Sequence, residues 1–342
     1  MHTKKYRLST LDVKQKLKGM KKALIYTAAT LGISWVVALV YHLTTGFTGP
    51  EMGLEALADF QKFATIYMFL PAIVAFILQA IGGELTIRRP HSARIKIVPR
   101  DNSLLRFRPR WSWLVAIATV PAMVALSILF SGLFSDVVPM KEGMVALVQA
   151  QGMGALPEEA MAELNAVPGW VMMLTSIVSA LLAGVTINAL FAFGEEYGWR
   201  FYMVDALRGR KFFVAALVIG AVWGIWHAPL ILMGHNYPDA RIAGIFMMVL
   251  FCILGGIVEL YFVVKSGTFW PAIFIHGTIN ALAGLGVILI PGGSRFLTGM
   301  TGIAGFMAIA VVIALLYLYD RYISHERIFH STLGSSLSRH EE

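Results

Sequence analysis

Eight apolar runs divide this chain, each about as long as one crossing of a lipid bilayer. A helix rises 1.5 Å per residue, so about 20 apolar residues cross the hydrocarbon core. The predicted spans are Ala23–Leu43, Ala64–Ile81, Trp111–Phe134, Val171–Phe193, Phe212–Met233, Ile245–Val264, Pro271–Ile290 and Thr301–Tyr319. The sequence therefore predicts an all-α polytopic membrane protein of eight transmembrane helices.

Composition supports this fold class and indicates which kind of partner to expect. Only 14% of the residues are charged and 57% are hydrophobic, whereas soluble domains carry about 25% charged residues. The net charge of +8 comes from basic residues that flank the apolar runs, so we expect membrane lipid, not nucleic acid, as the partner. The single cysteine, Cys252, allows no internal disulfide and no multi-cysteine metal site. We expect it to be a small buried apolar residue.

The loops between the runs alternate in charge. Residues 46–62 and 136–169 are acidic, whereas residues 85–110 and 208–211 are basic. Cytoplasmic loops carry the excess of Lys and Arg, so both termini are predicted to be cytoplasmic, in the plasma membrane if the source is prokaryotic. The first run is longer than the apolar core of a signal peptide and lacks a cleavage site, so we expect it to remain as an anchor.

Three regions follow from this topology. Residues 1–22 form a basic cytoplasmic N-terminus, residues 23–323 a transmembrane domain, and residues 324–342 a cytoplasmic tail. The polar residues that stand out against the apolar background lie between about 170 and 290, and we expect the functional site there.

Two glutamates and an arginine interrupt the end of the fourth run. A charge near the middle of a bilayer helix costs roughly 2.5–3.5 kcal/mol, so such residues are usually paired and functional. Glu196 and Arg200 are four residues apart, which allows an ion pair along one helix. Glu195 points about 100° away from Glu196. We therefore assign Glu195 to the site, and Glu196 and Arg200 to holding the helix.

Further polar residues lie in the runs that follow. His227 ends an apolar stretch, and His276 and Asn280 share one helix face because they are four residues apart. Asn188 lies seven residues before Glu195 and could orient it, and Glu259 either neutralises a neighbour or lies at the interface. One intramembrane histidine, or one Glu–Arg pair, can be merely structural. Together on several helices these groups favour a functional site, because each unmet polar group adds a burial cost.

The residue types suit hydrolysis of an amide bond. A carboxylate and an imidazole can activate a water, and an imidazole with an amide N–H can bind the oxyanion of a tetrahedral intermediate. The chain has no G-x-S-x-G motif, and the run from His325 to His330 is one residue too long for H-E-x-x-H. These absences favour water over a serine nucleophile and leave no local zincin motif.

Three motifs carry a resemblance to a known family. Glu195-Glu196-x-x-x-Arg200, Trp223-x-x-x-His227 and His276-x-x-x-Asn280 follow one another in this order. They resemble the motif set of the CAAX prenyl protease 2 / ABI (CPBP) family of intramembrane proteases, with Trp223 where phenylalanine is more usual. The resemblance covers about residues 170–290 and implies eight membrane helices with an intramembrane active site.

The resemblance also implies roles for these residues. Glu195 and His227 activate the water, His276 and Asn280 stabilise the oxyanion, and Glu196 and Arg200 position the helix. The family was long described as metalloendopeptidases, and a glutamate-dependent account without a metal is now favoured. No cofactor is therefore expected, with zinc on Glu195, His227 and His276 as the alternative.

The implied function is an intramembrane endopeptidase. Its substrate is a membrane-associated or prenylated peptide, cut near its C-terminus or at the cytoplasmic face of the membrane. Two other classes stay open: a non-catalytic immunity or scaffold protein, and a proton-coupled transporter using Glu and His as a relay. The transporter has less support because the sequence shows no paired repeats of broken helices.

Overall fold

The computed structural model describes residues 10–88, 96–99, 103–150 and 155–340. The fold is built from helices. The α-helices are α1 Thr10–Thr45, α2 Leu54–Tyr67, α3 Leu70–Ile81, α4 Trp111–Ser131, α5 Met140–Ala150, α6 Glu158–Ala166, α7 Gly169–Val185, α8 Ile187–Glu196, α9 Met203–Ala206, α10 Phe212–Trp226, α11 Ala228–Leu232, α12 Arg241–Ser266, α13 Trp270–Leu282, α14 Gly284–Leu289, α15 Ile303–Tyr322 and α16 Leu333–Leu337. Shorter turns are η1 Pro50–Met52, η2 Ser103–Leu105, the π-helical η3 Tyr197–Tyr202, η4 Ile328–His330 and η5 Ser338–His340.

The predicted helical architecture is confirmed, and the described residues add one small sheet to it. β1 Leu85–Arg88 pairs antiparallel with β2 Lys96–Pro99. This hairpin lies in the basic loop, between the helical spans, where the apolar pattern carried no information about pairing. Arg89, Arg94 and Arg100 of the same predicted loop lie outside the described residues.

Among the described residues, six helical segments are long and apolar enough to cross a membrane, and they match six of the eight predicted spans. They are Lys16–Met52, Leu54–Ile81, Trp111–Ser131, Arg241–Ser266, Trp270–Leu289 and Ile303–Tyr322. The pair α6 and α7, bent by 85°, provides a seventh if it is counted as one span. The predicted count of eight is therefore not confirmed.

The two other predicted spans are interrupted helices. The fourth run breaks between α7 and α8 at Thr186, whose φ of −121° and ψ of −91° are not helical. Its hydroxyl donates to the Leu182 carbonyl at 2.5 Å, a local bond that competes with the helix ladder. The fifth run leaves α10 with only 15 residues, because Pro229 has no N–H for the next helical bond. His227 lies at this second break.

Close packing of α10 on α12 determines where this second break, at His227, lies in the molecule. A Cβ added at Gly220 would lie 2.6 Å from the Ile253 Cα, and one at Gly224 would lie 2.4 Å from the Val249 Cα. Small residues at this spacing let membrane helices approach backbone to backbone. The end of α10, with His227 three residues after Gly224, is thereby held against the middle of α12.

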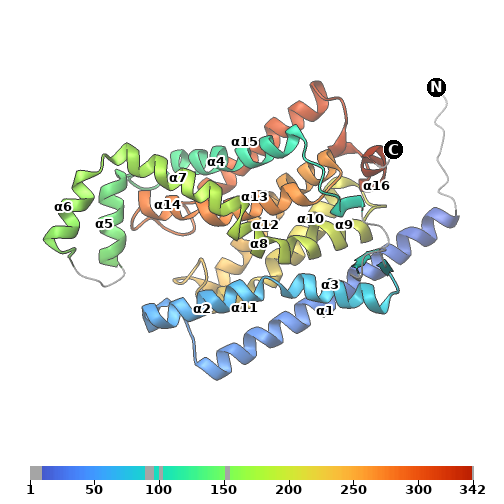
Figure 1. Ribbon diagram of the computed structural model, residues 1–342, viewed down its shortest axis with the longest axis horizontal. Helices are drawn as coiled ribbons and strands as arrows, with labels where there is room; N and C mark the ends of the chain where they lie inside the picture. Colours follow the sequence, from blue (N-terminus) through green and yellow to red (C-terminus); the bar gives the residue numbers. More distant parts are fainter. Residues whose placement is uncertain (1–9, 89–95, 100–102, 151–154, 341–342) are drawn as a thin grey trace.

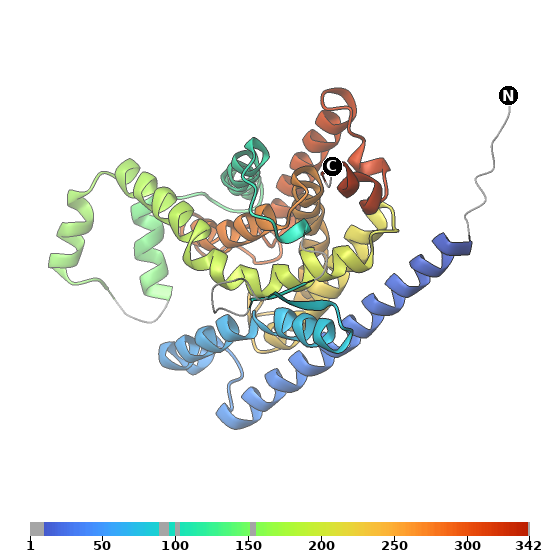
Figure 2. The same ribbon diagram turned by 45° about the vertical axis from the view of Figure 1, so that its right-hand side comes forward.

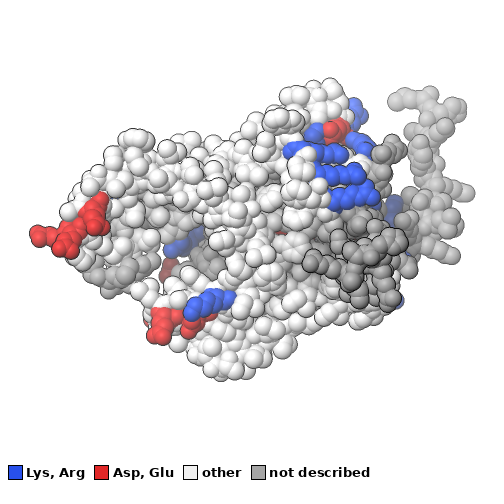
Figure 3. Space-filling view, viewed as in Figure 1, with Lys and Arg blue, Asp and Glu red and all other residues white. Residues whose placement is uncertain are grey.

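The two ends of the molecule differ in charge, as Figure 3 shows. The beginning of α1 and the chain around α16 lie at one end and share a cavity lined by Lys16, Lys18 and Thr332 (Figure 1). The acidic helices α5 and α6 lie at the other end (Figure 1). Figure 2 shows α1 running along one side between the two ends. We call the end that contains α16 the basic end, and the end that contains α5 and α6 the acidic end.

The C-terminal segment is folded onto the basic end. The Asp320 carboxylate accepts the backbone N–H groups of Ile328 and Phe329 at 3.1 and 3.3 Å. The Phe212 N–H then donates to the Ser331 carbonyl at 3.0 Å, which ties this segment to the start of α10. The predicted tail is therefore packed structure from Ile328 to Leu337.

Candidate functional site

The end of α8 and the π-helical turn η3 carry the two glutamates and the arginine of the first motif. Glu195, Glu196 and Arg200 are only 2%, 0% and 1% exposed. Two glycines press this segment onto its neighbours: a Cβ at Gly194 would lie 2.6 Å from the Met68 carbonyl oxygen, and one at Gly198 would lie 2.0 Å from the Tyr26 hydroxyl. Such single π-turns inside helices are frequent at functional sites.

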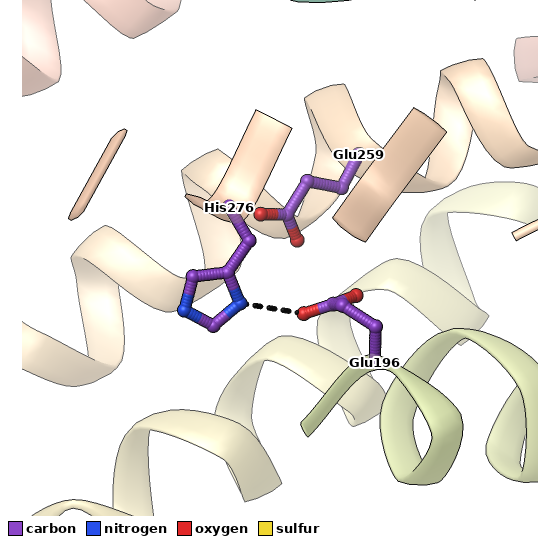
Figure 4. A group of neighbouring side chains, drawn as sticks. All are labelled: Glu196, Glu259 and His276. Atoms are coloured by element: carbon purple, nitrogen blue, oxygen red, sulfur yellow. Dashed lines mark hydrogen bonds and ion pairs between the residues drawn. The ribbon is translucent and has the colours of Figure 1, made fainter. Parts of the chain in front are cut away.

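Four buried charged or ionisable side chains form one cluster, which we call the charged cluster: Glu196, Arg200, Glu259 and His276. Arg200 Nη1 donates to Glu196 Oε1 at 3.1 Å, as the spacing along the helix predicts. Its Nη2 forms an ion pair with Glu259 on α12. The Nδ1 of His276, on α13, lies 2.8 Å from the same Glu196 oxygen (Figure 4). The cluster therefore ties together η3 and the helices α8, α12 and α13.

Glu195 has a different hydrogen-bond partner from the charged cluster. The Trp223 indole donates its Nε1–H to Glu195 Oε2 at 2.6 Å. The Trp223 ring also lies under the Arg200 guanidinium, whose Cζ is 4.3 Å from the ring centroid. Trp223 thus connects Glu195 with the charged cluster and fixes one carboxylate oxygen of Glu195.

His227 is held by the same tryptophan residue. Its Nδ1 lies 2.9 Å from the Trp223 carbonyl oxygen. A carbonyl oxygen can only accept, so Nδ1 carries the hydrogen, and in the neutral ring the Nε2 lone pair is the basic one. The ring is half-buried, and Cys252 Sγ lies 4.0 Å from its Nδ1. Cys252 itself is fully buried, as expected for a small apolar residue.

A cavity of about 540 Å³ brings the predicted residues together. Its lining includes Asn188, Glu195, Trp223, His227, Cys252, Glu259, His276 and Asn280. All four residues predicted to be catalytic therefore line one space. Asn188 also lines it, but the bond that orients Glu195 comes from Trp223.

The sequence did not determine the roles of Glu259 and Trp223. The sequence allowed Glu259 either to neutralise a neighbour or to lie at the membrane interface. In the structure its side chain is 0% exposed and pairs with Arg200. Trp223 was recognised only as the aromatic residue of a motif, and its indole N–H is the direct partner of Glu195. The signal for Glu259 was its charge within an apolar run, whereas no pattern in the sequence pairs Trp223 with Glu195.

The structure also bears on which residues could bind a metal ion. Among the described residues, Glu196, Glu259 and His276 offer ligand atoms that all lie within 4.8 Å of one another. The alternative zinc set of Glu195, His227 and His276 is not brought together in this way. Arg200 already contacts both carboxylates of the observed trio, so its positive charge occupies the place where a cation would be stabilised.

Comparison with known proteins agrees with the motifs. Residues 177–282 match the family model described as Type II CAAX prenyl endopeptidase Rce1-like. A stretch of 44 residues is 43% identical to CAAX prenyl protease 2 of Methanococcus maripaludis, and it covers 13% of this chain and 16% of that protein. The segment 177–282 contains all three motifs, so the predicted family resemblance is confirmed there.

Proposed function

We propose that this chain is an intramembrane endopeptidase that hydrolyses a peptide bond in a membrane-associated peptide, with both termini in the cytoplasm. The observation that carries the proposal is the single cavity lined by Glu195, His227, His276 and Asn280 beside a buried charged cluster. The match to a prenyl endopeptidase family over the same residues supports this reaction class.

Glu195 and His227 supply the bases in this proposal. Trp223 occupies Glu195 Oε2, which leaves Oε1 to accept a proton from a water molecule. The His227 Nε2 can accept from the same water, since its Nδ1 is bonded to a carbonyl. The water oxygen attacks the peptide carbonyl carbon, and the proton that it loses is later passed to the leaving nitrogen. No covalent enzyme intermediate is needed.

His276 and Asn280 would bind the oxyanion. His276 Nδ1 faces Glu196, so the other ring nitrogen, Nε2, is the atom that would donate to the oxyanion. Glu196 in this proposal orients the His276 ring as well as holding the helix.

The direct test is to compare membrane peptides from cells that carry the wild-type chain with peptides from cells that carry Glu195→Ala. Peptidase activity predicts products that are present with wild type and missing with the variant, together with accumulated precursors. An immunity or scaffold role predicts the same peptides in both strains and an unchanged phenotype. A transporter predicts proton-coupled flux in liposomes that the variant lacks.

We predict that chelators leave the activity unchanged. Arg200 already pairs with the carboxylates of Glu196 and Glu259. A divalent cation bound there would be strongly repelled by the Arg200 guanidinium. Initial cleavage rates of the purified protein in detergent, before and after dialysis against 1,10-phenanthroline, check this. A loss that added Zn²⁺ restores would support the zinc alternative instead.

We also predict that Trp223→Phe lowers kcat by about tenfold and changes KM little, because it removes one hydrogen bond to a carboxylate that acts in the reaction. Phenylalanine keeps the ring, and the resemblance places it at this position, so the fold should persist. Phe213→Leu, at an exposed position on the same helix, is the matched control. A variant with wild-type kcat would show that the indole N–H does not matter.

A further inference from the structure

The candidate site lies nearer the basic end of the molecule. Glu259 is seven residues before the end of α12 at Ser266, which places it about 10 Å above that end. His276 is six residues after the start of α13 at Trp270, about 9 Å from the same end. Judged only by these distances along the helices, the shorter path for a substrate to the site would start at the basic end.

Packing closes that path. Tyr197 and Phe201 on η3 and Phe269 just before α13 contact one another with ring centroids 4.9 to 6.4 Å apart, and none is more than 5% exposed. The turn η2 covers this aromatic layer from the basic side. The Phe269 N–H and the Thr268 hydroxyl both donate to the Leu104 carbonyl, at 3.0 and 2.9 Å.

The cavity instead continues toward the acidic end. Its lining extends from Glu259 and His276 to Asn236, Met300 and Thr301, which lie in the loops before α12 and α15. A second cavity of about 830 Å³ begins where the first ends. The two share the lining residues Gln61, Asn236, Asn280, Ala283, Met300 and Thr301.

This end of the molecule is acidic. Carboxylates outnumber basic side chains in its loops and short helices, which carry Glu51, Glu55, Asp59, Asp136, Glu142, Glu158, Glu159, Glu163 and Asp239 against Lys62, Lys141, Arg241 and Arg295. Desolvation lowers the pKa of the His235 imidazole, which lines the cavity, to about 4, so this ring is neutral at neutral pH. By the positive-inside rule, the end that is poorer in Lys and Arg faces away from the cytoplasm.

We propose that the substrate enters from the acidic end, so that the bond cut belongs to a membrane-anchored peptide presented on the extracytoplasmic side. This inference rests on the proposed peptidase function for its substrate, but the direction of entry rests on the cavity alone. It replaces the cytoplasmic cleavage implied by the family resemblance.

Cysteine accessibility tests the direction of entry without any substrate. The native Cys252 is changed to Ser, and single cysteines are introduced as Asn280→Cys in the cavity, Glu159→Cys on the acidic end and Ser338→Cys on the basic end. All three native side chains are exposed. Right-side-out and inside-out membrane vesicles are treated with a methanethiosulfonate that carries a trimethylammonium group, and labelling is followed by mass spectrometry.

The cysteine at position 280 should react in the vesicles in which that at position 159 reacts, at least about tenfold faster than in the opposite vesicles, because a fixed charge crosses the bilayer poorly. Reaction from the face that labels position 338, or from neither face, would overturn the proposal. Position 159 should react in right-side-out vesicles, and labelling in inside-out vesicles would overturn the extracytoplasmic assignment.

Mapping the Glu195-dependent cleavage sites completes the test. They should fall on the side of the membrane that position 159 faces, and sites on the opposite side would contradict the inference while leaving the peptidase function intact. If no Glu195-dependent product exists, the proposed function fails, and the labelling result still decides which way the cavity opens.

Discussion

Glu195→Gln should lower kcat for peptide cleavage by about 10²–10⁴-fold, the usual contribution of a general base. The amide has nearly the same shape and can still accept the Trp223 N–H through its oxygen. It cannot take a proton from water. Because the shape and the hydrogen bond are kept, thermal unfolding of the purified variant should resemble that of the wild type. The loss should appear in kcat, measured with a peptide substrate identified by comparing membrane peptides of wild-type and Glu195→Ala cells.

Two matched variants make this result specific. Glu159→Gln changes an exposed acid on α6 and should leave kcat unchanged. Glu196→Gln removes the partner of His276, so it should also reduce kcat, through the oxyanion instead of the water. If Glu195→Gln keeps wild-type activity while Glu196→Gln loses it, the roles of the two glutamates are reversed.

Hydropathy predicted the six longest apolar segments and did not predict the breaks within the fourth and fifth runs. Six predicted spans correspond to long apolar segments, because run length is what hydropathy measures. The breaks at Thr186 and His227 depend on backbone conformation within runs that remain apolar throughout. These two runs also carry the first and second motifs, so the eight-span prediction stays unconfirmed where the chain departs from regular helix to position its polar groups.

The site was predictable where its contacts are local. The Glu196–Arg200 pair follows from four-residue spacing on one helix. The contacts of His276 with Glu196, of Glu259 with Arg200 and of Trp223 with Glu195 join different helices. Their geometry depends on close approaches such as that of α10 to α12 at Gly224, which spacing in one sequence does not encode. Glu196 was therefore predicted with one partner and has two.

Arg200→Gln should destabilise the fold strongly. The guanidinium is 1% exposed and contacts two carboxylates that are both 0% exposed. Removing one partner of a buried ion pair costs about 3–5 kcal/mol, because the remaining charge is buried without compensation or must take up a proton. In a chain of this size such a loss lowers Tm by about 5 °C. Thermal unfolding in detergent, followed by light scattering or dye binding, measures it.

A surface pair provides the matched control. Arg241→Gln removes the partner of Glu51, and the two side chains are 28% and 55% exposed. Exposed pairs contribute about 0–1 kcal/mol, so Tm should change by no more than about 1–2 °C. Equal effects of the two arginine variants would show that the charged cluster is hydrated and that burial does not set its energy.

The double variant Arg200→Gln/Glu259→Gln distinguishes charge imbalance from lost packing. It removes one positive and one negative charge, and it leaves Glu196 paired with His276. If charge imbalance is the cause, the double variant should recover most of the stability lost in Arg200→Gln, because contacting residues are strongly coupled. If the double variant is as unstable as the single one, the contribution of Arg200 lies in its packing against Trp223.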